Sequence, residues 1–270
     1  MKHLIILSIL ALTACAQAQA EVTPIVLPTP KSIEQAVASP FRTEVFKARD
    51  KYRHPSETLK FFGLKSNMKV LEVIPGAGWY LEIIAPYVND NGKYVMAIKV
   101  PPTGEPQSKP ILEWSKMHPE ISQNMSTVNF DLSNPALELG VANSMDMVLT
   151  FRNVHNWMAN KSQDVAFKAF FNVLKKGGVL GVVEHRAPED RTDPLAPTGY
   201  VRKSDLVAMA KKAGFRLAAE SEINANPKDK KDYKDGVWTL PPTLTLKEVD
   251  REKYLAIGES DRMTLKFVKP

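Results

Sequence analysis

The sequence predicts an α/β fold built on a doubly wound, Rossmann-like sheet. Short apolar runs rich in valine and isoleucine recur along the chain, and segments of helical spacing separate them. Strands that alternate with helices of about 10–15 residues form parallel sheets with right-handed crossovers. With 270 residues, 44% of them apolar and 24% charged, the chain is long enough and ordinary enough in composition for one such globular domain.

Seven apolar runs are expected to be strands. In chain order they are Lys69–Ile74, Lys93–Val100, Met125–Asp131, Asp146–Phe151, Val179–Glu184, Phe215–Ile223 and Met263–Val268. Between and before them, helical spacing predicts helices within residues 41–62 and at Trp79–Val88, a short one through Trp114, and others at Ser162–Leu174 and Lys203–Ala213.

Local signals are expected to limit these helices. A cap near Pro55-Ser56 and a stop at Gly63 bound the end of the first helical region, and Gly214 ends the helix at Lys203–Ala213. Lys175-Lys176, followed by Gly177-Gly178, is typical of a basic last helical turn with a glycine stop.

The N-terminus predicts export. A basic start, Met1-Lys2-His3, precedes the apolar stretch Leu4–Leu12. Nine residues rise about 13–14 Å as a helix, which is short of a bilayer core of about 30 Å. Residues 1–20 are therefore expected to be a secretory signal peptide.

The site of cleavage has two interpretations. Leu12–Cys15 (L-T-A-C) resembles a bacterial lipobox, in which Cys15 is lipidated and anchors a periplasmic protein to a membrane. Ala18-Gln19-Ala20 is an alternative cleavage site, which would yield a soluble periplasmic or secreted product. Residues 21–40 are expected to be a proline-rich tether, residues 41–270 form the domain, and a single cysteine allows no intramolecular disulfide.

Charge indicates few macromolecular partners. The net charge is +6, and the lysine run Lys228–Lys234 is interrupted by acidic residues, as in a solvated loop. We therefore expect no nucleic-acid partner and membrane contact only through the lipid anchor. Nothing in the sequence indicates the oligomeric state.

The stretch E-V-I-P-G-A-G-W-Y, residues 72–80, joins the first predicted strand to a helix. Gly76 and Gly78 would let the backbone approach a small ligand, and the helix N-terminus would offer free N–H groups. The alternative is that both glycines serve packing only. A nicotinamide dinucleotide is not favoured, because G-x-G-x-x-G would need glycine at Leu81.

The order of motifs from about Arg42 to Pro270 resembles that of class I S-adenosylmethionine-dependent methyltransferases. R-H-P-S-E-T-L-K-F-F-G-L, V-L-E-V-I-P-G-A-G-W-Y and D-R-M-T-L-K-F-V-K-P together resemble an exported bacterial family predicted to be methyltransferases. The resemblance implies a seven-stranded sheet of order 3-2-1-4-5-7-6 with strand 7 antiparallel and helices on both faces. It also implies S-adenosyl-L-methionine as cofactor and a small-molecule methyl acceptor.

The resemblance assigns a cofactor site with two departures. Glu72 matches the motif's acidic residue, Gly76 and Gly78 its second and third glycines, and Ile74 replaces the first glycine. Lys99 stands near the end of the second strand, where the family has an acidic residue for the ribose, and a lysine accepts no hydrogen bond. The residues expected to bind the cofactor are Glu72, Pro75, Gly76, Gly78, Trp79, Asp131 and Arg53.

Two of these residues have alternative interpretations. Asp131 matches the residue that contacts the adenine amine, but it would equally cap a helix before Ser133. Arg53 would reach the cofactor's carboxylate, or it would lie on the surface.

The carboxyl ends of strands 4 and 5 carry the candidate chemistry, since ligands of doubly wound sheets bind at that edge. His155 is the candidate general base, Asn153 would orient the acceptor, and Glu184 would orient His155. The residues expected to bind the acceptor are Asn156, Trp157, His185 and Tyr200, with the loop Asn226–Pro242, anchored at Val237-Trp238, as a further wall.

Each of these assignments has an alternative as well. His155 and Trp157 would instead pack beneath the following helix, and Glu184 would pair with Arg186 or Arg152. His155, Glu184 and His185 lack the spacing of a metal site, so no metal is expected.

The sequence thus predicts an exported methyltransferase that acts on a small molecule. The competing hypothesis is a catalytically inactive, methyltransferase-like periplasmic protein that binds another ligand. Lys99 and the uncertain supply of S-adenosylmethionine outside the cytoplasm favour this second hypothesis.

Overall fold

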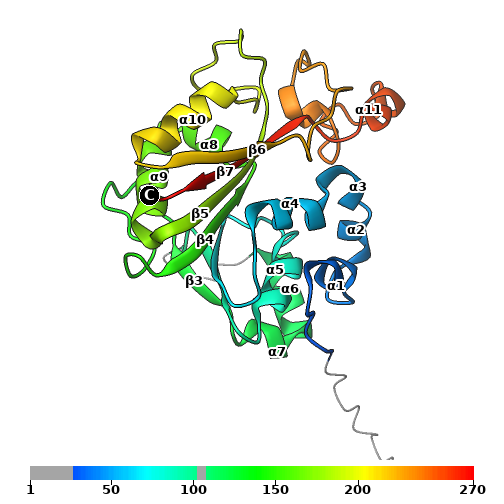
Figure 1. Cartoon of the computed structure of the whole chain (residues 1–270). Coiled ribbons are helices and arrows are strands. Elements are labelled where there is room, and N and C mark those ends of the chain that lie inside the picture. Colours follow the sequence, from blue (N-terminus) through cyan, green and yellow to red (C-terminus); the bar gives the residue numbers. More distant parts are fainter. Residues whose placement is uncertain (1–26, 102–107) are drawn as a thin grey trace, which may run out of the picture.

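The computed structural model describes residues 27–101 and 108–270. Within them, seven strands form one sheet of order β3-β2-β1-β4-β5-β7-β6 (Figure 1), the order that the family resemblance implies. The strands are β1 (Lys69–Val73), β2 (Lys93–Ile98), β3 (Ser126–Asn129), β4 (Met145–Phe151), β5 (Leu174–His185), β6 (Arg216–Ser221) and β7 (Arg262–Val268). Strand β7 is antiparallel to β5 and β6, and the other pairings are parallel.

The register brings the carboxyl ends of the central strands to one edge of the sheet. Val73 at the end of β1 lies opposite Ala97 of β2 and Thr150 of β4, and Phe151 lies opposite Val183 of β5. The loops that follow β1, β4 and β5 therefore meet at this edge, which is where a doubly wound sheet binds ligands.

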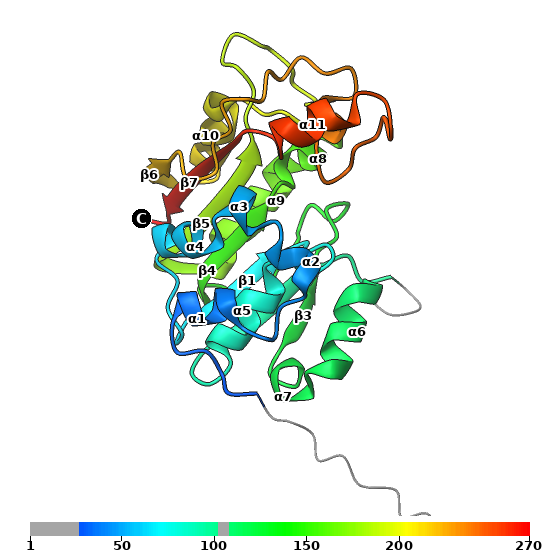
Figure 2. The same cartoon turned by 90° about the vertical axis from the view of Figure 1, so that its right-hand side faces the viewer.

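Helices cover both faces of the sheet (Figures 1 and 2). The helices are α1 (Ile33–Ala38), α2 (Glu44–Lys47), α3 (Asp50–Arg53), α4 (Pro55–Phe62), α5 (Leu81–Val88), α6 (Lys109–Met117), α7 (Pro119–Ser122), α8 (Val154–Ala159), α9 (Gln163–Val173), α10 (Lys203–Lys212) and α11 (Arg251–Ile257), with a 3₁₀ turn at Gly236–Thr239. One apolar core lies beneath α8, α9 and α10, and a second lies beneath α1, α4, α5 and α6. None of the helices in the described part of the chain is long and apolar enough to span a membrane.

Two predicted helix limits are wrong. Lys175–Gly178 belong to β5 and not to a last helical turn, because the chain is already extended at Leu174, and Gly177 N donates to Lys269 O at 2.8 Å. Helix α4 begins at Pro55 after the left-handed His54, so Ser56 is not its cap. The glycine stops at Gly63 and Gly214 are confirmed, with φ of +84° and +107°.

The expected tether is shorter than residues 21–40. Ser32 Oγ accepts a hydrogen bond from Gln35 N and caps α1, whose Ile33 and Ala36 are buried in the second core. This part of the chain is packed against the domain. The predicted signal peptide and Cys15 lie outside the described residues.

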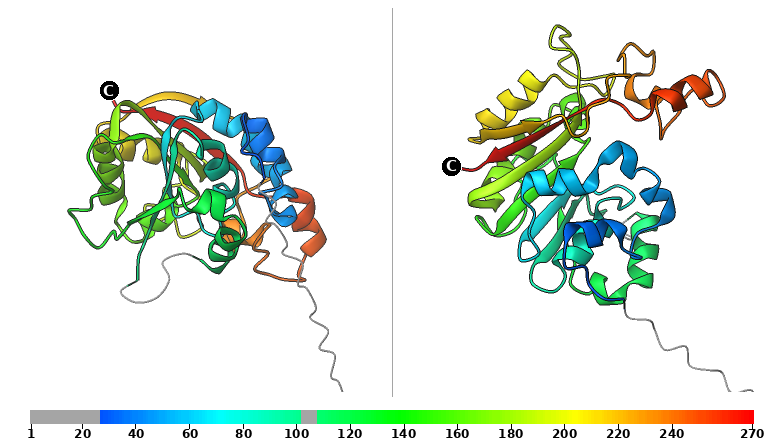
Figure 3. Two further views of the ribbon diagram at one scale, coloured as in Figure 1. Left: turned by 90° about the horizontal axis from the view of Figure 1, so that it is seen from below. Right: turned by 45° about the vertical axis from the view of Figure 1, so that its right-hand side comes forward.

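The segment between β6 and β7 crosses the carboxyl edge of the sheet and meets the N-terminal helices (Figure 3). It is anchored at several points, whereas the sequence predicted one. Val237 is buried against Tyr200, and Tyr200 Oη donates to Asp229 at 3.0 Å. Glu259 pairs with Arg49 and Arg53 of the N-terminal helices. The site is therefore closed by segments from both ends of the chain.

Candidate functional site

The glycine loop after β1 has the left-handed backbone of a cofactor loop, although its first glycine is replaced. Ile74, Gly76 and Gly78 have φ of +48°, +63° and +94°. A Cβ on Gly76 would meet no atom within 4 Å, whereas one on Gly78 would lie 3.1 Å from Ile111 Cγ1. Ile74 holds a conformation that costs an L-residue roughly 1–2 kcal/mol, so the surrounding structure imposes this shape on the loop.

A first pocket of about 200 Å³ lies over this loop. Five of the seven residues expected to bind the cofactor line it, and these are Arg53, Glu72, Pro75, Gly76 and Trp79. Gly78 lies behind the loop, where α6 packs on it. Asn153, a predicted catalytic residue, also lines this pocket.

Glu72 sits at the floor of the first pocket as a buried carboxyl. Tyr94 Oη donates to its Oε2 at 2.5 Å. Burial raises the pKa of Glu72 to about 7, against the opposing effects of the Tyr94 hydrogen bond and the charge of Arg152. Near neutral pH this carboxyl is therefore close to its midpoint, and a ligand ammonium group would favour its ionised form.

Trp79 and Arg53 form a wall of the first pocket. Trp79 Nε1 donates to Phe46 O at 3.0 Å, and the Arg53 guanidinium lies 4.7 Å from the Trp79 ring centroid. Arg53 is only 3% exposed and its Nε pairs with Glu259 at 3.3 Å. The alternative of a surface role for Arg53 is therefore wrong.

The region expected to hold the ribose and adenine has fewer free hydrogen-bonding groups than the first pocket. Asp131 Oδ1 accepts hydrogen bonds from Ser133 N and Ser133 Oγ, at 3.1 and 2.7 Å, and lies 3.5 Å from Lys99 Nζ. A turn and not a helix follows Asp131, so the helix-cap interpretation is wrong in that form. Lys99 pairs with Asp131 instead of offering a ribose acceptor.

A second pocket of about 320 Å³ adjoins the first, with which it shares Arg49, Arg53 and Arg152. Its remaining lining comes from the ends of β4 and β5, from the segment after β6, and from the residues before β7. These residues are His155, Asn156, His185, Val237, Trp238, Pro241, Pro242, Thr243, Glu259 and Ser260. Three residues predicted to act on or bind the acceptor, His155, Asn156 and His185, are brought together here.

Glu184 fixes the orientation of His155. This fully buried carboxylate accepts hydrogen bonds from Val154 N at 2.6 Å and His185 N at 2.9 Å, and His155 Nδ1 lies 3.1 Å from its Oε1. In the neutral ring this arrangement leaves Nε2 as the proton acceptor. The sequence proposed Glu184 as the group that orients His155, and the structure brings the two side chains into contact.

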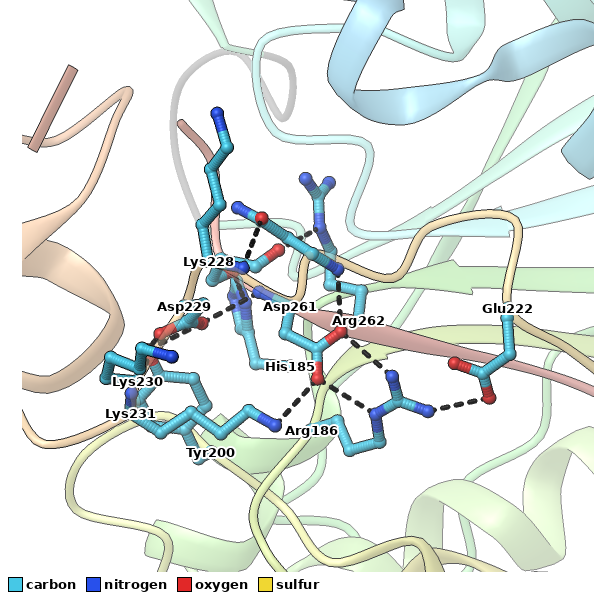
Figure 4. Close-up of polar contacts among 12 residues, drawn as sticks. His185, Arg186, Tyr200, Glu222, Lys228, Asp229, Lys230, Lys231, Asp261 and Arg262 are labelled. Carbon is cyan, nitrogen blue, oxygen red and sulfur yellow. Dashed lines mark hydrogen bonds and ion pairs between the residues drawn. The ribbon is translucent and has the colours of Figure 1, made fainter. Parts of the chain in front are cut away.

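The alternative partner of Glu184 is engaged elsewhere. Arg186 makes a two-pronged bond to Asp261 and pairs with Glu222 (Figure 4). Lys231 also pairs with Asp261 at 2.8 Å. This network holds the segment after β6 against the end of β5.

Three predicted site residues have structural roles instead. Trp157 is 2% exposed and packs against Phe130, Phe167 and Phe170 in the first core, away from both pockets. Tyr200 is buried beneath Val237 and bonds to Asp229, so it supports the pocket from behind.

Asn153 is the third of these residues, and its side chain has a structural role. Its Nδ2 donates to Val73 O at 2.9 Å and Thr150 Oγ1 at 3.2 Å, which ties β4 to β1. The amide nitrogen is thus already engaged by the protein, and the structure assigns Asn153 to the first pocket rather than to the acceptor.

Positive charge dominates the border of the two pockets. Burial alone would raise the pKa of Glu259, but Arg262, Arg53 and Arg49 outweigh it and hold this pKa at about 2. Burial, the neighbouring His155 and the charges of Arg152, Arg262 and Arg53 lower the pKa of His185 well below its usual range, so this ring is neutral.

One candidate cation cluster lies in this region. Ligand atoms of His155, Glu184 and His185 lie within 4.8 Å of one another. The hydrogen bonds to Glu184 already engage both its oxygens, and the neighbouring arginines would repel a divalent cation. The local chemistry thus favours an anion over a metal.

Sequence reasoning missed Arg49, Arg262 and Glu259 as site residues. They cluster only because chain segments about 210 residues apart meet, and Arg49 and Glu259 carry no local motif. Arg152 lies just after β4, where candidate chemistry was expected, but the sequence indicated it only as an alternative ion-pair partner of Glu184.

Comparison with known proteins finds solved structures of the same fold. No family model and no curated protein matches the chain, whereas solved structures do. A SAM-dependent methyltransferase from Aquifex aeolicus matches with a TM-score of 0.53 and 17% identity, over 83% of this chain and 93% of that one. Phosphoethanolamine N-methyltransferase 2 of Haemonchus contortus, solved with S-adenosyl-L-methionine, matches at 0.54 and 15%, over 88% and 60%.

A third match is to a cyclase. The [4+2]-cyclase SpnF matches with a TM-score of 0.52 and 18% identity, over 88% of this chain and 91% of that one. At such identities the likeness concerns the fold. The chain thus has the fold of class I S-adenosylmethionine-dependent methyltransferases, with the strand order and the antiparallel seventh strand that the family resemblance implies.

Glu72→Gln should make the stability of the protein less sensitive to pH. Because the folded-state pKa is raised from 4.5 to about 7, the folded protein binds this proton more tightly than the unfolded chain does. The free energy of unfolding should therefore fall, by about 3 kcal/mol, as pH rises through that interval. Urea unfolding at about pH 5 and about pH 8 measures the loss. An equal loss in the wild type and in Glu72→Gln would refute the assignment.

Proposed function

We propose that the protein is an S-adenosylmethionine-dependent methyltransferase that acts on a small-molecule acceptor. The observation that carries the proposal is the first pocket. A left-handed loop leaves open space above Gly76, with the buried carboxyl of Glu72 and the guanidinium of Arg53 lining the same cavity. These groups fit the ammonium and the carboxylate of the cofactor's methionine end.

The cofactor, when bound, supplies an electrophilic methyl group. The protein's own part is to position the acceptor and to accept its proton. The second pocket adjoins the first, and His155 lines it with a ring that Glu184 orients. A base held in this way, together with fixed alignment of the two reactants, is most of what methyl transfer to oxygen or nitrogen requires of a protein.

The competing proposal is a binding protein that uses this fold without methyl transfer. Lys99, which pairs with Asp131 where a ribose acceptor is expected, favours it. The match to a structure described as a cyclase also fits it, since the fold hosts more than one reaction. Glu72 and the open loop favour methyl transfer, because a protein without this cofactor has no evident use for them.

We also propose export and a lipid anchor at Cys15, on the strength of the basic start, the short apolar stretch and L-T-A-C. Cys15→Ser should move the protein from the membrane fraction to the soluble fraction when bacterial cells are fractionated. A wild-type protein found in the soluble fraction would exclude the anchor and support cleavage after Ala20.

Gly76→Leu should abolish cofactor binding. The leucine side chain would enter the open space above the loop, whereas Gly177→Leu adds the same strain, at φ of +76°, in open space at the other end of the sheet. Both variants should lose roughly 1–2 kcal/mol of stability. Calorimetric titration with S-adenosylmethionine and S-adenosylhomocysteine should show binding by wild type and Gly177→Leu only.

Thermal unfolding provides a second readout of the same titration. Ligand at 100 times its dissociation constant should stabilise the wild type by about 2.7 kcal/mol, or roughly 5–10 °C. If neither ligand binds the wild type at millimolar concentration, the binding-protein alternative replaces the methyltransferase.

A further inference from the structure

The second pocket has an excess of positive charge. Four arginines, Arg49, Arg53, Arg152 and Arg262, surround Glu259, which is 4% exposed. Three of them pair with Glu259, at 2.7 Å for Arg49, 3.3 Å for Arg53 and 3.0 Å for Arg262. One carboxylate cannot neutralise four guanidinium groups, so three positive charges remain uncompensated within the cluster.

Arg152 has no ion-pair partner among the residues that the structure describes. Its side chain lines both pockets, and its backbone has a φ of +62°, which is rare for a residue with a side chain. Burial and the charge of Arg262 lower the pKa of its guanidinium to about 10. In the free protein this arginine is thus held in a costly position, with its hydrogen-bond donors unused by any carboxylate.

Arg49 offers a further donor. Its Nε is engaged by Glu259, but its Nη2 is buried without a hydrogen-bond partner in the described structure. A buried donor left unpaired keeps its full desolvation penalty. On the wall of one pocket, Arg49 thus has a buried donor without an acceptor and Arg152 has no ion-pair partner in the described structure. An oxyanion would serve both groups.

The rest of the pocket is suited to an apolar body. Val237, Trp238, Pro241 and Pro242 form one wall, and the Trp238 ring meets the His155 ring edge to face, with their centroids 5.9 Å apart. The network of Asp261, Arg186 and Lys231 holds the segment that carries this wall (Figure 4).

We propose that the second pocket binds a small organic acid, whose carboxylate or phosphate is held by Arg152 and Arg49 and whose apolar body lies against Trp238. This inference rests on the proposed function, for which it names the class of acceptor. The acidic group would also reduce the uncompensated positive charge at the pocket border.

The same charges couple the two pockets. S-adenosylmethionine carries a sulfonium and an ammonium against one carboxylate, and the first pocket shares three arginines with the second. The shared arginines repel the net positive charge of S-adenosylmethionine until an anion binds in the second pocket. An organic acid should therefore tighten S-adenosylmethionine binding, more than it tightens that of the neutral S-adenosylhomocysteine, and the effect must be reciprocal.

The test uses phenyl phosphate and benzoate as probes, with benzyl alcohol as the uncharged counterpart, at constant ionic strength. Calorimetry should show that the wild type binds at least one acid and does not bind the alcohol. Arg152→Gln should weaken this binding at least tenfold, while Arg216→Gln, which removes an exposed arginine on β6, should leave it unchanged. Unliganded Arg152→Gln should unfold at the same temperature as the wild type or a higher one, because it removes an unpaired charge.

Three results would overturn the proposal: no binding of either acid by the wild type, equal binding by Arg152→Gln, or a lower unfolding temperature for that variant, which would mark Arg152 as structural. The cofactor titration is separate. Binding of the acids without any binding of S-adenosylmethionine or S-adenosylhomocysteine would sustain the anion pocket and exclude the methyltransferase. Binding of those cofactors with no binding of either acid would exclude only the anion pocket.

Discussion

The ion pairs around Glu259 hold the functional end of the molecule together. This carboxylate, just before β7, receives Arg49 and Arg53 from the N-terminal helices and Arg262 from β7 itself. Removing one partner of a buried pair typically costs 3–5 kcal/mol, since the other charge stays buried. Because these contacts join segments about 210 residues apart, both pockets depend on them. Without Glu259, Arg49 and Arg53 would face Arg152 and Arg262 with no counter-charge between them.

The site combines this positively charged border with a buried carboxyl, Glu72, at its floor. Burial keeps Glu72 partly protonated near neutral pH, and the arginines surround the cavity on its other side. Two of the ten non-glycine residues with a positive φ in the described structure, Ile74 and Arg152, lie on the pocket walls. Such strain persists only where packing imposes it, and it is a frequent mark of ligand sites. Free energy is thus stored where a ligand of the right charge would offset it.

Much of the fold was predictable because local patterns encode it. The apolar runs located all seven strands, and glycine stops located two helix ends, at Gly63 and Gly214. The site was predictable where one loop carries it, as with the glycine loop, or where the ends of neighbouring strands meet, as with the Glu184–His155 pair. Trp157 was misassigned although it lies three residues after the buried Val154, on the same face of α8. The arginine cluster escaped prediction, since tertiary contacts alone bring it together.

The central claim is that the loop after β1 still holds the methionine end of S-adenosylmethionine despite Ile74 and Lys99. The most direct measurement is a crystal structure of the protein with S-adenosylhomocysteine. The account predicts ligand density above Gly76, with the amino group near Glu72 and the carboxylate near Arg53. Density elsewhere, or an empty loop in crystals soaked at millimolar concentration, would contradict it.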